Sequence, residues 1–203
     1  MTAPDRLPAA LLALWLAALV LSGIQPHDRL TWLLEVAPVI VAVPLLIVTR
    51  KTFPLTPLLY VLIFVHGLIL MLGGHFTYAL VPPGFWVQEA FDLARNHYDR
   101  LGHFAQGFIP AVLAREILLR KTALRPGKML FYLVVSVCLA FSAFYELVEW
   151  WAAVILGQDA DQFLGTQGDP WDTQWDMFMA MSGAVAALLT LAHRHDRQIE
   201  KLG

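Results

Sequence analysis

Six apolar stretches, each about as long as a membrane-spanning helix, constrain what this chain of 203 residues can fold into. A helix needs about 20 mostly apolar residues to cross the hydrocarbon core of a bilayer. Only 15% of the residues are charged, against about 25% in soluble domains. The sequence therefore predicts an all-α, polytopic membrane bundle of about six helices that forms one integral membrane domain over residues 1–203. The predicted spans are 7–23, 30–49, 56–74, 99–119, 129–156 and 172–192.

The Lys and Arg residues predict the orientation of this bundle. Cytoplasmic loops of membrane proteins carry an excess of these residues. If both termini are cytoplasmic, only Arg29, Arg95 and Arg100 lie on the outer side, and all the other bases lie inside. The loops near residues 75–97 and 157–170 are then external. The formal net charge of −2 gives no basic surface for nucleic acid, so the expected partner is membrane lipid, with the oligomeric state open.

Three of the apolar stretches contain pairs of polar residues where a lipid-facing helix should carry none. A charge near the bilayer centre costs roughly 3 kcal/mol, so such residues are usually paired, buried in protein or functional. Each pair is spaced i,i+3 or i,i+4 and therefore shares one helix face. In the predicted topology all three faces lie at the outer side. The pairs are Asp99 and His103, Glu146 and Glu149, and Asp172 and Asp176.

This set of residue types is typical of a metal site. Several carboxylates at close range cannot all stay charged unless a cation joins them. Oxygen ligands with one imidazole suit a divalent ion such as zinc, manganese, iron, magnesium or calcium. We predict that this ion is bound by Asp99, His103, Glu146, Asp172 and Asp176.

The predicted metal site favours a hydrolase that opens to the outer side. Glu149 would be the catalytic general base that activates a water molecule, although little in the sequence separates it from Glu146. The substrate would be a lipid or a lipid-linked molecule at the depth of the head groups. The enzyme would thus be a metal-dependent membrane hydrolase.

Other interpretations stay open at this point. Asp99 and Asp172 are also suitable helix caps, and Arg100 could form a structural ion pair with Glu146 or Glu149. Intramembrane acids and histidines are also found in the proton relays of transporters. A cation- or proton-coupled transporter and a structural or partner-binding membrane protein are therefore the alternatives.

Three segments of the sequence resemble the YjdF family of bacterial inner-membrane proteins. They are Tyr98-Asp99-Arg100-Leu101-Gly102-His103-Phe104, Glu146-x-x-Glu149-Trp150, and the stretch from Gly165 to Met177. The resemblance extends from about residue 30 to residue 190, and a looser similarity to VanZ-like membrane proteins includes the Asp99-x-x-x-His103-Phe104 element. Because the family is a domain of unknown function, the resemblance implies a multi-pass inner-membrane protein without an assigned activity.

Overall fold

The computed structural model describes residues 3–157 and 166–202, and the elements it describes are helices. All six predicted stretches are confirmed as helices. A short helix, α4, and a 3-10 turn, η1, were not predicted and lie between α3 and α5. The elements are α1 (Ala3–Ser22), α2 (Arg29–Thr49), α3 (Pro57–Phe76), η1 (Tyr78–Leu80), α4 (Pro82–Ala90), α5 (Tyr98–Lys121), α6 (Lys128–Leu156), α8 (Asp172–Ile199) and η3 (Glu200–Leu202).

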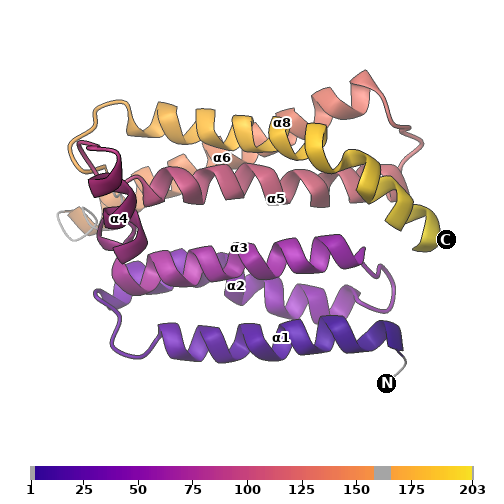
Figure 1. Cartoon of the computed structure of the whole chain (residues 1–203), viewed down its shortest axis with the longest axis horizontal. Coiled ribbons are helices and arrows are strands. Elements are labelled where there is room, and N and C mark those ends of the chain that lie inside the picture. The colour runs from indigo at the N-terminus through magenta and orange to yellow at the C-terminus, as the bar shows by residue number, and fades with distance from the viewer. Residues whose placement is uncertain (1–2, 158–165, 203) are drawn as a thin grey trace.

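The six long helices run lengthwise through the molecule, and the two chain termini lie at the same end (Figure 1). Helix α4, the turn between α1 and α2, and the start of α8 lie at the opposite end. Helix α5 packs along α8 and also contacts α3 and α6, while α1 and α2 pack on α3. Helix α5 is therefore the central element of the bundle.

Four of the described helices, α2, α3, α6 and α8, are long and apolar enough to cross a membrane. Helix α1 contains a shorter apolar stretch, Arg6–Ser22. Helix α5 is long enough but carries many polar residues, and those are buried inside the protein: Asp99, Arg100, His103, Gln106, Arg115 and Glu116. Hydropathy alone therefore supports a helical membrane protein with four candidate spans.

Local capping explains where α2 and α3 begin. Asp28 precedes α2, and its carboxylate accepts a hydrogen bond from the Thr31 backbone N–H at 2.7 Å, which lowers the pKa of Asp28. Thr56 caps α3, and Pro57 follows it in the first turn, where its missing N–H costs no hydrogen bond. These residues fix the starts of the two helices that face α5 and α6 across a cavity.

Small residues let α5 and α8 approach closely. A Cβ atom on Gly107 would overlap the backbone carbonyl of Ala180, and one on Gly183 would overlap the backbone of Phe104. Ala184 and Ala187 continue the buried small-residue face of α8. Close contact through glycine and alanine is a common way to pack helices in membranes, where no hydrophobic force drives helices together. The approach brings the polar residues of α5 and α8 within reach of one another.

The last helix extends beyond residue 192, where the predicted membrane span ends. Helix α8 continues to Ile199, and His195 in this extension is only 1% exposed. His195 Nε2 lies 2.9 Å from a carboxylate oxygen of Glu116, and Arg115 donates to Asp196 at 2.6 Å. Because buried polar residues of α5 satisfy these groups, the polar end of α8 stays helical and packed.

We expect Gly107→Ala to destabilise the protein by about 1–3 kcal/mol, because one added methyl group forces the α5 and α8 backbones apart. The measurement is unfolding of the purified protein in detergent. Leu101→Ala is the control, because Leu101 is 48% exposed on the same helix and should change stability far less. Equal effects of the two substitutions would contradict the close packing of α5 on α8.

Candidate functional site

The first turns of α5 and α8 bring their acids together at the end of the bundle that contains α4. Asp99 and His103 lie on one face of α5, Asp172 and Asp176 lie on one face of α8, and all four are buried. Neither Asp99 nor Asp172 occupies the N-cap position of its helix, which is His97 in α5 and Trp171 in α8. Capping therefore does not explain these two acids.

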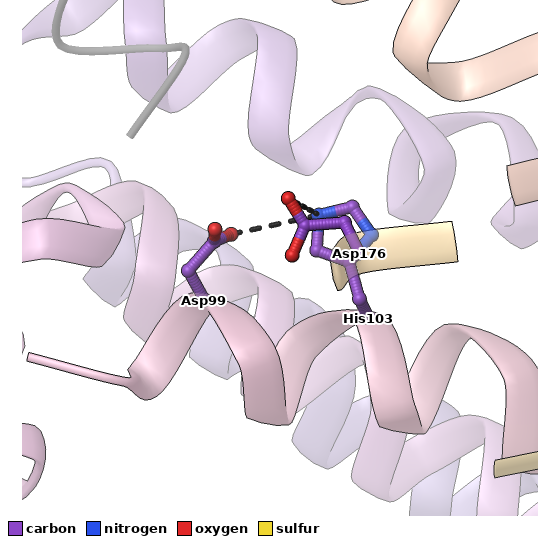
Figure 2. A group of neighbouring side chains, drawn as sticks. All are labelled: Asp99, His103 and Asp176. Atoms are coloured by element: carbon purple, nitrogen blue, oxygen red, sulfur yellow. Dashed lines mark ion pairs between the residues drawn. The ribbon is translucent and has the colours of Figure 1, made fainter. Parts of the chain in front are cut away.

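Asp99, His103 and Asp176 form the tightest group, and their side chains converge from α5 and α8 (Figure 2). His103 Nε2 lies 3.5 Å from Asp99 Oδ1 and 3.9 Å from Asp176 Oδ2. One potential ligand atom from each residue lies within 4.8 Å of the other two. Ligands about 2.0–2.2 Å from one ion are roughly 3.0–3.6 Å apart, so small side-chain shifts would bring these atoms to coordination distance.

Four buried atoms of this cluster have no hydrogen-bond partner among the described residues. They are Asp99 Oδ2, His103 Nδ1, Glu146 Oε1 and Asp176 Oδ1. Glu146 comes from α6, and its Oε1 lies 3.8 Å from His103 Nδ1. Buried polar atoms are nearly always hydrogen-bonded, because leaving one unpaired costs about 1–3 kcal/mol. Such a concentration of unpaired atoms at one point is typical of a binding site.

Asp172 takes part in ion pairs instead of lying with the tight group. Its Oδ1 accepts from Arg95 at 2.8 Å and from Arg100 at 3.2 Å. Arg100 also donates to Asp169 at 2.8 Å, and its Nε lies 3.5 Å from Asp176 Oδ1. The Trp171 backbone N–H and the nearby Arg100 lower the pKa of Asp169. Among the described residues, Arg100 thus forms ion pairs with aspartates, and not with Glu146 or Glu149, the alternative considered from the sequence.

The last predicted site residue, Glu149, lines a cavity of about 510 Å³ between α2–α3 and α5–α6, together with Asp99 and His103. The end of the cavity near the start of α5 is polar and includes Glu35, Tyr78, Asp99, His103, Tyr145 and Glu149. The rest is mostly apolar and extends to Thr49 of α2 and Lys121 of α5. The Asp99 and His103 side chains thus border both the acidic cluster and the cavity.

Several participants were not identified from the sequence. Arg95 could have been found, because it lies four residues before Asp99 and their side chains are 4.0 Å apart. No local signal marks the pairing of Asn96 with Gln167, in which the Gln167 amide donates to the Asn96 carbonyl at 2.8 Å. These contacts attach the segment before α8 to the segment before α5.

Other polar residues considered from the sequence lie elsewhere. His75 Nδ1 is 2.9 Å from the Ser22 carbonyl, away from the acids. Asp159 and Asp161, expected in the external loop, lie outside the described residues. Four tryptophans at the end of α6 and the start of α8 are exposed: Trp150, Trp151, Trp171 and Trp175.

Comparison with known proteins places the chain in a family. Residues 7–197 match the family model described as predicted membrane protein (DUF2238). The chain is also 58% identical over 185 residues to the inner membrane protein YjdF of Escherichia coli (strain K12), covering 91% of this chain and 88% of that protein. No solved structure matches it. The chain belongs to the DUF2238 family of membrane proteins.

We expect Arg100→Gln to destabilise the protein strongly, because it leaves buried aspartates without their counter-charge. Removing one partner of a buried ion pair typically costs about 3–5 kcal/mol. Arg100→Gln/Asp172→Asn should recover part of the loss, since the second change removes an unpaired negative charge. The measurement is a double-mutant cycle of unfolding in detergent. Strictly additive effects would contradict the pairing of Arg100 with Asp172.

Proposed function

We propose that this DUF2238 protein is a metal-dependent hydrolase of the bacterial inner membrane that acts on a lipid or lipid-linked substrate from the periplasmic side. One observation carries the proposal. Asp99, His103, Glu146 and Asp176 each keep a buried side-chain atom without a hydrogen-bond partner among the described residues, and Asp99 and His103 also line the polar end of a largely apolar cavity. A divalent cation would satisfy those atoms, and the cavity would admit an amphiphile.

The proposal includes six membrane spans with both termini in the cytoplasm. The termini lie at the same end of the bundle in Figure 1, as an even number of crossings requires. Helix α5 can cross because α3, α6 and α8 pack around it and its charged residues are buried in protein. The acidic cluster lies at the end opposite the termini. The distribution of Lys and Arg predicts that this end faces the periplasm.

We assign metal binding to Asp99, His103 and Asp176, with Glu146 beside them. His103 presents Nε2 to the two aspartates and Nδ1 to Glu146. A carboxylate behind a ligating imidazole commonly holds the ring in position, so Glu146 would orient His103 or join it as a ligand. Asp172 would keep Arg95 and Arg100 in place beside the site. The bound ion would lower the pKa of water and polarise the substrate.

Hydrolysis then needs a base and a route for the proton. In the proposed reaction, Glu149 removes a proton from water as the water oxygen attacks the ester of the substrate. The ester bond to the leaving oxygen breaks, and that oxygen receives the proton. Glu149 suits this role because it is 9% exposed and lines the same cavity as Asp99 and His103.

A transporter is the second candidate, and one observation favours it. The cavity lies between α2–α3 and α5–α6 and extends from the acidic end to Lys121 at the other end of α5. Titratable side chains along it include His66, whose Nε2 has no hydrogen-bond partner among the described residues. Ion flux in proteoliposomes, lost in Asp99→Asn, would support transport. Turnover of lipid without ion flux would support the hydrolase.

The topology predicts that alkaline phosphatase fused after Gln88 in α4 is active, because that helix lies on the periplasmic side. A fusion after Arg125, in the turn between α5 and α6, should be inactive because it stays in the cytoplasm. The measurement is phosphatase activity in cells, normalised to the amount of fusion protein. The reverse pattern would contradict both the orientation and a site that faces the periplasm.

Chelation should lower the unfolding temperature of the purified protein. A metal that binds only the folded state adds about 2.7 kcal/mol to the free energy of unfolding when the free metal concentration exceeds Kd about 100-fold. Restoring metal should raise the unfolding temperature of the wild type again, but not that of His103→Ala. His193→Ala is the matched control, because His193 is exposed near the far end of α8 and should respond like the wild type. A wild-type unfolding temperature that changes with neither chelator nor added metal would contradict the metal site.

A further inference from the structure

We infer that the cavity between α2–α3 and α5–α6 binds the hydrocarbon chain of a lipid whose head group has no net negative charge, and places that head group against Asp99, His103 and Glu149. The inference names the substrate class of the proposed hydrolase and rests on that function for the reaction. The chain-binding site itself stands on the shape and lining of the cavity.

The cavity has the form of a groove. Helix α2 packs on α3, helix α6 packs on α5, and α3 contacts α5, but α2 and α6 have no extensive contact with each other. Helices α3 and α5 therefore form its floor, and α2 and α6 form its walls. Residues on this lining are partly exposed, including Leu45 (57%), Ile117 (43%) and Phe141 (49%). In a bilayer such an opening faces hydrocarbon, so a lipid can enter from the side.

The length of the groove suits a long chain. Its lining on α2 runs from Glu35 to Thr49, which is roughly 21 Å of helix at 1.5 Å per residue. One leaflet contributes roughly 15 Å of hydrocarbon to the bilayer. A chain with its head at the outer acids would therefore keep apolar contacts beyond the bilayer centre. Leu46, Leu113 and Ile117 supply apolar surface along this path.

The polar end of the groove determines the charge of the head group. Glu35, Asp99 and Glu149 border it, together with the hydroxyl groups of Tyr78 and Tyr145. Lys121, the lysine among the described lining residues, lies at the opposite end of the groove. The carboxyl groups of Glu35 and Glu149, which the proposed ion does not use, accept hydrogen bonds from hydroxyl or ammonium groups, and no lysine or arginine among the described lining residues balances an anionic head at this end. A neutral or cationic head thus fits this end better than an anionic one.

Photocrosslinking tests the inference. The probe is monopalmitoylglycerol with a diazirine in its chain, added to the full-length protein in detergent. We expect adducts on the groove lining and a yield roughly tenfold lower in Leu45→Trp/Ile117→Trp, because the added rings displace at least two methylene contacts. Val41→Trp/Val48→Trp is the matched control, since both residues are exposed on α2 outside the groove, and its yield should equal the wild type.

Competition experiments examine the head group. Unlabelled monopalmitoylglycerol and palmitoylcholine should reduce labelling more than palmitate, which has the same chain with an anionic head. Equal competition by palmitate would overturn the head-group assignment. Adducts spread evenly over the surface, or equal yields from the two double variants, would overturn chain binding.

The same experiment with chelator separates this inference from the proposed hydrolase. Groove labelling that persists after chelation, in a protein that does not hydrolyse lipid when metal is restored, would support chain binding and count against the metal-dependent reaction. A protein that binds metal but shows no labelling of the groove would overturn chain binding and leave the metal site standing.

Discussion

The close packing of α5 on α8 is the contact on which the rest of the structure depends. Gly107 and Gly183 allow the two backbones to approach, and the polar residues at both ends of the helices then meet. At one end Asp99 and His103 face Asp176; at the other, Glu116 lies 2.9 Å from His195. Because each polar group lies in protein and away from hydrocarbon, α5 can carry charges that a lipid-exposed helix could not.

Charge balance divides the acids at the start of α5 and α8 into two groups. Arg95 and Arg100 pair with Asp169 and Asp172 at 2.8–3.5 Å, which compensates these two acids within the protein. The arginines approach Asp99 and Asp176 of the tight group only at 4.0 and 3.5 Å, and this group retains buried atoms without a hydrogen-bond partner among the described residues. This difference is the physical reason to place the cation there and to give Asp172 a supporting role. It also explains why the site borders the groove through residues of α5.

Hydropathy and helical spacing predicted much of this arrangement. The six helices follow from the apolar runs, and the i,i+4 spacing placed Asp99 beside His103 and Asp172 on the face of Asp176. The sequence could not predict which aspartates the arginines neutralise, because Arg95 precedes α5 and its partner Asp172 is brought close only by tertiary packing. The burial of His195 and the groove also depend on how helices far apart in the sequence pack.

The most direct test of the account is a crystal structure of the purified protein with anomalous scattering data, supported by elemental analysis. We expect one divalent ion per chain, bound by Asp99, His103 and Asp176, and its loss in Asp176→Asn. Asp172→Asn should retain the ion, because Asp172 pairs with the arginines. A protein without metal, whose His103 and Asp176 side chains are bridged by water or by hydrogen bonds alone, would contradict the central claim.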